Sequence, residues 1–145
     1  LMAYVHVAHD CIIGDNSILA NGVQLGGHVE IGNNTTIGGM TPVHQFCKIG
    51  DFAFIGGGLR IVQDVPPFIL AMGEPLKFSG LNTVGSRRNN FSSEIRNNIK
   101  KAYSIIYKSE MNRTQALTAI KKMFKKVSEI DQIINFINNS SRGLI

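Results

Sequence analysis

A strict six-residue period from Leu1 to Ile61 constrains the fold of this chain more than any other feature. Every sixth residue in this range is Leu, Ile or Val, and the residue after it is Gly or Ala in eight of eleven cases. An α-helix repeats apolar residues every 3.6 residues and a simple strand every second residue, so neither explains this period. A hexapeptide repeat is typical of a parallel β-helix, in which three hexads form one coil.

This repeat predicts which side chains form the interior of the β-helix. The aliphatic residue of each hexad is expected to point inward and to stack on its copies in the neighbouring coils. Cys11 and Cys47 both occupy a small inward position, two coils apart. Because strands stack at roughly 4.8 Å, their sulfurs are expected about 10 Å apart, too far for a disulfide. Both cysteines are therefore predicted to be free thiols in a reducing compartment.

All four histidines of the chain lie within these repeats. The separations from His9 to His28 and from His28 to His44 are each close to one coil of three hexads, and His6 lies beside His9 in the stretch "HVAHDC". The predicted coil therefore places the histidines along one side of the prism. The same side is predicted to carry Gly27 one coil above His9, followed by Gln45 and Gln63.

This column has the residue types that acyl transfer requires. His9 is a candidate general base because imidazole titrates near neutral pH. Asp10 is placed to orient its ring. Gly27 offers an unobstructed backbone N–H, which is a candidate oxyanion donor. An open prism face becomes a pocket when two prisms pack together, so the column predicts a cyclic homo-oligomer with sites between subunits.

Two other interpretations of the histidines are open at this stage. Zn²⁺ requires its ligands within about 2.1 Å of one point, whereas His9, His28 and His44 are expected to rise about 5 Å per coil. The spacing therefore favours an extended organic substrate, and no metal site and no cofactor are predicted. The remaining interpretation is that these are solvated turn histidines without a role.

Several stretches resemble one known family, the UDP-N-acetylglucosamine O-acyltransferases of lipid A biosynthesis. They are "HVAHDC", "LGGHVEIG", "IGGMTPVHQF", "QDVPPF" and "SSRGLI", and the resemblance runs over the whole chain, as the C-terminal part of such an enzyme. It implies an all-β left-handed parallel β-helix followed by a small α-helical C-terminal domain, assembled as a homotrimer. It also implies transfer of an R-3-hydroxyacyl group from acyl carrier protein to the 3-hydroxyl of UDP-N-acetylglucosamine.

The resemblance also implies roles for individual residues. His9 matches the general base of the family, Asp10 matches the neighbour that sets its ring, and Gly27 matches the oxyanion donor. Gly57 matches the position that limits acyl chain length. The chain departs from the family pattern at Val84, where an acidic residue is common, and at Asn89, where a second basic residue is common. The positions that match substrate or nucleotide contacts are His6, His28, His44, Gln45, Asn82 and one of Arg87 or Arg88, of which an ungapped alignment favours Arg88.

The six-residue rhythm stops after Pro66 and Pro67. The predicted division is a β-helix over 1–66, a linker with strand and turn segments over 67–91, and a three-helix module over 92–145. Caps are predicted at Ser92 or Ser93, at Thr114, and at Ser128 with Asp131 as a capping box. The apolar positions of the three helices are Ile95, Ile99, Ala102, Ile106, Leu117, Ile120, Phe124, Val127, Ile130, Ile133, Ile134 and Ile137.

Charge is divided unevenly between the two halves. Residues 1–66 carry two basic and five acidic side chains, whereas the remainder carries thirteen basic and five acidic. The basic second half suits an acidic carrier protein, although simple solvation of the helices explains it equally well. No nucleic-acid motif and no apolar run of membrane-spanning length are present, so nucleic-acid binding and membrane insertion are not predicted. A cytoplasmic location is expected.

Three functions are therefore compared. The acyltransferase is favoured, because the histidine column occurs together with the specific stretches "GGMTPVHQF" and "QDVPPF". The alternatives are a zinc-dependent hexapeptide-repeat enzyme and a non-catalytic, truncated β-helix module.

Overall fold

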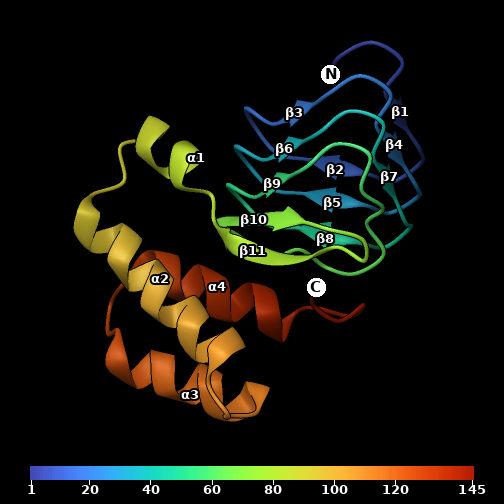
Figure 1. Cartoon of the computed structure of the whole chain (residues 1–145). Coiled ribbons are helices and arrows are strands. Elements are labelled where there is room, and N and C mark those ends of the chain that lie inside the picture. Colours follow the sequence, from blue (N-terminus) through green and yellow to red (C-terminus); the bar gives the residue numbers. More distant parts are fainter.

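The first part of the chain is a parallel β-solenoid of short strands (Figure 1). The computed structural model describes all residues, 1–145. Nine consecutive hexads each contribute one two-residue strand, and turns connect these strands. The strands are β1 His6–Val7, β2 Ile12–Ile13, β3 Ile18–Leu19, β4 Gln24–Leu25, β5 Glu30–Ile31, β6 Thr36–Ile37, β7 Pro42–Val43, β8 Lys48–Ile49 and β9 Phe54–Ile55.

Three sheets form the three faces of the prism, and the strands of the coils pair in parallel. The first contains β1, β4 and β7, the second contains β2, β5 and β8, and the third contains β3, β6 and β9 together with two later strands. The register is constant, because each residue pairs with the residue three hexads later; His6 pairs with Gln24, and Gln24 with Pro42. The predicted coil of three hexads is therefore confirmed.

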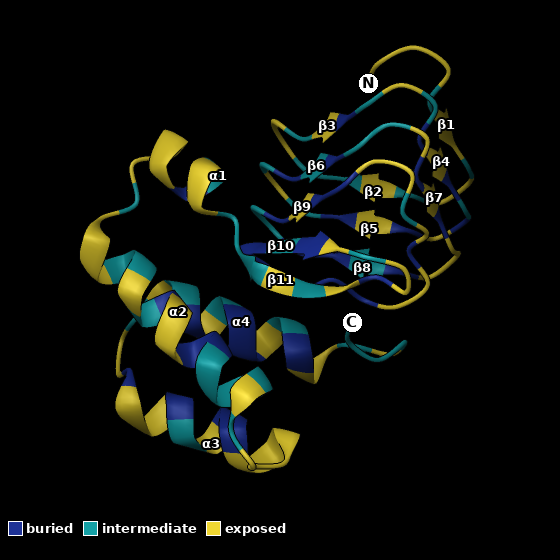
Figure 2. Ribbon diagram, in the orientation of Figure 1, coloured by how far each residue is buried: buried dark blue, intermediate teal, exposed yellow.

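The aliphatic residue of each hexad fills the interior from the second coil onward (Figure 2). Leu19, Ile37, Ile55 and Ile61 are fully buried. The small inward position of the repeat, which Thr35 and Cys47 occupy, is also buried. The hydroxyl of Thr35 donates to the carbonyl of Gly50 at 2.8 Å, so this polar group has a hydrogen-bond partner inside the core. The predicted interior is thus confirmed for these coils. Both cysteines are free thiols, as predicted.

A short antiparallel pair and an unpredicted helix follow the coils. Strand β10, Ile69–Met72, pairs in parallel with β9 and antiparallel with β11, Lys77–Leu81. Helix α1, Thr83–Arg88, begins after Asn82, whose side-chain oxygen accepts a hydrogen bond from the Gly85 N–H at 3.1 Å. A helix this short has no apolar period, so the sequence pattern does not predict it.

The last three helices pack together at the C-terminal end of the solenoid, far from its first coil (Figure 1). They are α2 Ser93–Lys108, α3 Arg113–Met123 and α4 Ser128–Asn138. Their expected apolar faces are buried at Ile99, Ile120 and Ile133, among others. One cluster of 27 buried residues extends from the coils into these helices. The division of the chain into separate domains therefore stays a prediction.

The structure confirms one predicted helix cap and corrects two. Ser92 caps α2, since its hydroxyl accepts from the Ile95 N–H at 3.1 Å. Helix α3 begins behind Asn112, which forms a reciprocal capping box with Gln115, and Thr114 lies inside the helix. The predicted box of Ser128 and Asp131 is absent, because the Ser128 hydroxyl bonds to Glu129 and Val127 takes the cap position.

Two buried or half-buried carboxylates join the helical part to the solenoid. The Gln132 amide donates to Asp51 at 2.7 Å, and the Ser140 hydroxyl donates to the fully buried Asp64 at 2.6 Å. The other oxygen of Asp64 accepts from the Lys48 backbone N–H at 2.7 Å. These contacts fix the orientation of the helices against the coils. None of the helices is both long and apolar enough to cross a bilayer.

Candidate functional site

The turns that join the first and second sheets bring His9, Asp10, Gly27 and His28 together, and we call these four residues the histidine corner. His9 Nδ1 lies 2.9 Å from Asp10 Oδ2, and His28 Nε2 lies 3.8 Å from the same oxygen. The two imidazoles meet edge to face, with ring centroids 5.0 Å apart. The backbone N–H of His28 donates to the carbonyl of His9 at 3.1 Å, so the ordinary ladder between coils positions both residues.

The two imidazoles lower the pKa of Asp10. The hydrogen bond from His9 is the largest cause, followed by the nearby charge of His28. A carboxyl whose pKa is lower in the folded state stabilises the fold above its unfolded pKa, and this contribution is lost as pH falls through the folded value. Asp10 is therefore ionised at neutral pH, and its charge favours the tautomer of His9 that carries hydrogen on Nδ1 and a free lone pair on Nε2.

Gly27 lies directly against the imidazole of His9. A Cβ atom at position 27 would lie 2.7 Å from both Cε1 and Nε2 of His9, so the exposed His9 ring would have to move to make room for it. The backbone N–H of Gly27 donates to no acceptor in the chain. The corner thus places an uncommitted amide donor beside the nitrogen of the candidate base.

Phe46 completes the stack at this corner and is not among the site residues predicted from the sequence. Its ring is parallel to that of His28, with centroids 4.8 Å apart and an angle of 4° between planes. Asp10, His28 and Phe46 follow one another at intervals of one coil and all have positive φ, a region that Gly22 and Gly58 occupy at another corner. The interval of three hexads is the signal that could have found this third residue.

The structure does not continue the imidazole column from His28 to His44. The residue in register with His28 is Phe46, whereas His44 follows the end of strand β7 and its Nδ1 lies 3.2 Å from the carbonyl of Gln45. The prediction that His9, His28 and His44 form one continuous column is therefore wrong by two residues. His6 is exposed on strand β1, next to the corner.

Asn82 and Arg88 lie on another face of the prism. They line a groove of about 600 Å³ between α1 and the third sheet, together with Ile18, Thr36 and Phe54. The side chain of Asn82 also caps α1 and donates to the carbonyl of Phe52 at 2.9 Å. Within one chain, these two residues and the histidine corner therefore do not line one cavity.

Gly57 lies in the turn after β9, at the corner between the third and first sheets. Its backbone is exposed, and a Cβ atom there would lie 3.2 Å from the carbonyl of Gly39. A larger side chain at this position would therefore extend into the space outside the prism.

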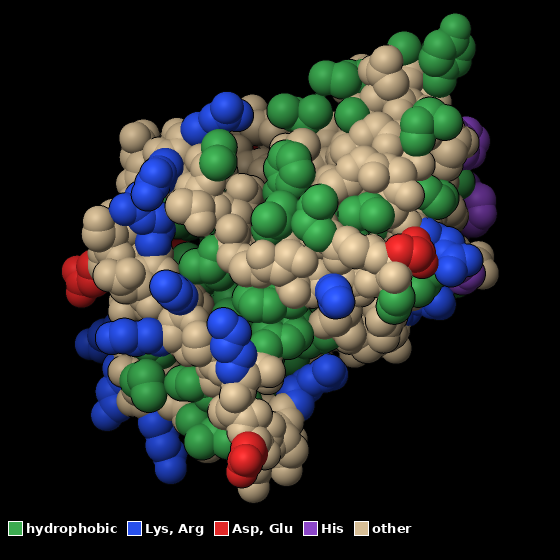
Figure 3. Space-filling model, in the orientation of Figure 1, with side chains coloured by type: hydrophobic (Ala, Val, Ile, Leu, Met, Phe, Trp, Pro, Cys, Tyr) green, Lys and Arg blue, Asp and Glu red, His purple; other side chains and the backbone are tan.

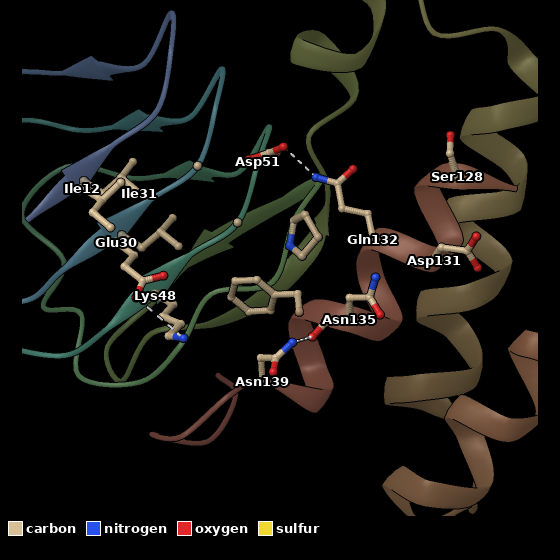
Figure 4. A pocket seen from close by; sticks show the side chains of 15 residues that line it. Ile12, Glu30, Ile31, Lys48, Asp51, Ser128, Asp131, Gln132, Asn135 and Asn139 are labelled. Atoms are coloured by element: carbon tan, nitrogen blue, oxygen red, sulfur yellow. Dashed lines mark hydrogen bonds and ion pairs between the residues drawn. The ribbon is translucent and has the colours of Figure 1, made fainter.

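A second groove, of about 640 Å³, lies between α4 and the second sheet (Figure 4). Its polar lining includes the Asp51–Gln132 hydrogen bond and an ion pair between Glu30 and Lys48 at 3.7 Å. None of the predicted site residues lines it. Its side chains join the helices to the coils, and we assign no reaction to it.

Basic side chains gather on the helices, away from the histidine corner. Most Lys and Arg side chains in view lie over the helical part, whereas the histidines lie at the opposite edge (Figure 3). No acidic residue pairs with a basic residue of α2 or α3 in a salt bridge. The exposed lysines of the helical part are Lys100, Lys101, Lys108, Lys121, Lys122, Lys125 and Lys126.

Comparison with known families accounts for both parts of the chain. Residues 64–145 match the model described as UDP N-acetylglucosamine O-acyltransferase, domain 2. Residues 1–27 match the bacterial transferase hexapeptide repeat. The chain belongs to the UDP-N-acetylglucosamine O-acyltransferase family. The resemblance of its sequence motifs to this family is thereby confirmed.

Relatives of the family align over the whole chain. An acyl-[acyl-carrier-protein]–UDP-N-acetylglucosamine O-acyltransferase from Halorhodospira halophila is 46% identical over 145 residues, and that from Thiobacillus denitrificans is 40% identical. The chain spans 56% of the length of each. Solved UDP-N-acetylglucosamine acyltransferases from Moraxella catarrhalis and Bacteroides fragilis superpose with TM-scores of 0.96 and 0.97, at 43% and 44% identity. Both superpositions cover all of this chain, but only 56% of the Moraxella catarrhalis chain and 57% of the Bacteroides fragilis chain.

Proposed function

We propose that this chain carries the acyl-transfer site of a UDP-N-acetylglucosamine O-acyltransferase. The reaction moves an R-3-hydroxyacyl group from acyl carrier protein to the 3-hydroxyl of the sugar, as an early step towards lipid A. The observation that carries the proposal is the histidine corner, where Asp10 holds His9 at 2.9 Å and the free N–H of Gly27 lies beside the His9 ring. The names of the curated relatives support the donor and the acceptor.

The geometry supports direct transfer with no protein nucleophile. His9 Nε2 removes the proton from the sugar hydroxyl as its oxygen attacks the thioester carbonyl. The Gly27 N–H donates to the oxyanion of the tetrahedral intermediate. Collapse of that intermediate breaks the carbon–sulfur bond, and the departing thiolate takes the proton from the His9 imidazolium. Asp10 stabilises that imidazolium and keeps Nδ1 protonated throughout.

A second copy of the chain completes the site. Asn82 and Arg88 are the candidate nucleotide contacts, yet they line a groove on a different face from the histidine corner. A cyclic trimer would place that groove of one subunit against the histidine corner of its neighbour, as the family resemblance implies. Ile18, Met40 and Phe54 are exposed on the solenoid, which supports packing between prisms.

The remaining assignments rest on the resemblance and on local features. We propose that the coils wind left-handed and that Gly57 leaves room for a long acyl chain. His6, His44 and Gln45 are proposed substrate contacts beside the corner. The unpaired lysines of α2 and α3 are the proposed docking surface for the acidic carrier protein. The two free thiols support a cytoplasmic location.

The first test compares transfer by the chain with transfer by His9→Ala. Loss of a general base lowers the rate by about 10²–10⁴-fold. Asp131→Asn, which changes an exposed side chain of the groove between α4 and the second sheet and no predicted site residue, serves as the control and should keep the rate of the parent chain. Circular dichroism of each variant verifies the fold. Equal transfer by parent and His9→Ala would refute the role of His9, and no transfer by a folded trimer would refute the proposal for this chain.

The second test examines whether sites form between subunits. His9→Ala and Arg88→Ala are each expected to lower transfer strongly as separate homotrimers. If each site takes His9 from one subunit and Arg88 from its neighbour, randomly mixed trimers restore about a quarter of the sites. Unmixed samples combined without subunit exchange are the control. Activity that stays at the level of the separate variants after verified exchange would contradict a shared site.

A further inference from the structure

The histidine corner also has the geometry of a metal site, through His9, Asp10 and His28, which we call the metal trio. One ligand atom of each residue lies within 4.8 Å of the other two, and two of the separations are 2.9 and 3.8 Å. Ligands of a tetrahedral Zn²⁺ ion lie about 3.3–3.6 Å apart, given bonds of about 2.0–2.2 Å. All three side chains are exposed, so they are free to rotate towards an ion.

The imidazoles of the trio are held near these positions before any ion binds. His28 is stacked on Phe46 with an angle of 4° between the rings, and it meets His9 edge to face. The side chains of His9 and Asp10 are 71% and 66% exposed, so water can take the remaining coordination position. Arrangements with three protein ligands and one open position are typical of Zn²⁺.

The spacing of the histidines in the sequence argues against a metal site made of His9, His28 and His44, which lie on three successive coils. It does not argue against a site whose third ligand is a residue other than His44. The structure removes His44 from the column and puts the Asp10 carboxylate between the two remaining imidazoles. Two nitrogen ligands and one carboxylate suit Zn²⁺ and related transition-metal ions, whereas Mg²⁺ and Ca²⁺ prefer oxygen ligands alone.

We propose that the metal trio binds a divalent transition-metal ion and that the metal-bound state cannot catalyse acyl transfer. The inhibitory part rests on the proposed function, whereas the binding part does not. A metal on His9 Nδ1 takes the place of the hydrogen that faces Asp10. The neutral imidazole then carries its single hydrogen on Nε2, so no lone pair is available to accept the proton of the sugar hydroxyl. Binding of metal and catalysis therefore exclude each other.

Cobalt provides a direct test of binding. Co²⁺ titrated into the chain in a non-chelating buffer should give visible d–d bands of a low-coordinate site, saturate at one ion per chain, and be displaced by Zn²⁺ but not by Mg²⁺. His28→Gln and Asp10→Asn should each weaken binding at least about tenfold. His44→Gln is the matched control, since it also removes an exposed imidazole of the same solenoid, and it should bind as the parent does.

Several results would overturn the binding proposal. One is the absence of Co²⁺ bands. Another is an equal affinity for Co²⁺ in the parent, His28→Gln and Asp10→Asn, which would indicate an adventitious ion only. Weakened binding in His44→Gln to the level of His28→Gln would assign the ion to different residues. Circular dichroism of each variant excludes unfolding as the cause of lost binding.

Transfer assays test the inhibitory part separately. Zn²⁺ should reduce transfer with a midpoint equal to its measured dissociation constant, and a chelator should restore it. If a chelator abolishes transfer by the isolated protein, the metal is required for transfer and does not inhibit it. That result would contradict the inhibitory role and favour a zinc-dependent enzyme. If Zn²⁺ binds without any effect on transfer, the inhibited state does not exist. Metal binding by a chain that shows no transfer would support the trio while refuting the proposed function.

Discussion

Two corners of the prism occupy the same position in the hexapeptide repeat. They differ in whether the backbone N–H groups of their turns have a hydrogen-bond acceptor. At the corner between the second and third sheets, the N–H of Asp15 donates to the Asn33 side chain, and the N–H of Asn33 donates to the Asp51 side chain, each at 2.7 Å. The equivalent residues at the histidine corner are His9, Gly27 and Gln45. There the N–H of Gly27 has no acceptor.

The comparison shows how one repeat supports both stability and chemistry. At the first corner, the turn N–H groups of Asp15 and Asn33 each donate a hydrogen bond to a short polar side chain one coil later. We call this corner the closed corner. At the histidine corner, glycine supplies no side chain, and the space that a Cβ would fill is occupied by the His9 ring. An amide donor left without a partner is unfavourable in the folded state, and it is the feature that an oxyanion site requires.

Among the changes that test this comparison of the two corners, adding one methyl group at the histidine corner is expected to have the largest effect. In Gly27→Ala the new Cβ would lie 2.7 Å from His9 Nε2, so the ring must move away from its position. We expect kcat for transfer to fall about 10²-fold or more, because misplacing a catalytic group by about 1 Å has an effect of this size. Steady-state kinetics measures it, with circular dichroism to verify the fold.

A double-mutant cycle separates this steric effect from a loss of folding. In the His9→Ala background there is no ring to displace, so Gly27→Ala should lower transfer little further. Additive losses would show that residue 27 acts independently of His9.

A change at the closed corner should affect stability and leave catalysis unchanged. Asn33→Ala removes the acceptor of the Asp15 N–H, which is exposed and can bind water instead. We expect the free energy of unfolding to fall by about 0.5–1.5 kcal/mol, with unchanged kcat. Urea denaturation measures the first quantity and a transfer assay the second. Asn33→Asp, which keeps an acceptor oxygen, is the matched control, and a fall in kcat for Asn33→Ala would end the contrast between the corners.

The smallest expected effect is on the titration of Asp10. Its pKa is lowered chiefly by the hydrogen bond from His9, and secondly by His28. In His9→Gln the pKa of Asp10 should rise towards its ordinary value of 3.8, and in His28→Gln it should rise less. NMR titration of the Asp10 carboxyl carbon measures both shifts. The reverse order would mean that His28, and not His9, is the main partner of the carboxylate.

The helical half shows where local sequence signals are insufficient. The Ser92 cap is predicted correctly, but Asn112 and Val127 take the positions expected for Thr114 and Ser128. Several hydroxyl and amide residues compete near each of these helix starts, and the choice depends on how the helices pack. Helix α1 escapes prediction because it depends on Asn82, whose side chain caps the helix and donates to the carbonyl of Phe52 in the turn before β9.

The six-residue period is enough to establish the solenoid, the register of its coils and which residues of neighbouring coils pair with one another. A period of six repeats the same environment in every third hexad, so the burial of Leu19, Ile37 and Ile55 and the contact of Gly27 with His9 follow from the repeat. The repeat also puts Phe46 one coil after His28. Other features emerge only in the folded molecule: the Phe46 and His28 rings lie parallel, Asp10 lies between two imidazoles, and Arg88 lies on a different face. These features depend on side-chain rotation and on packing between distant segments, which no repeat encodes.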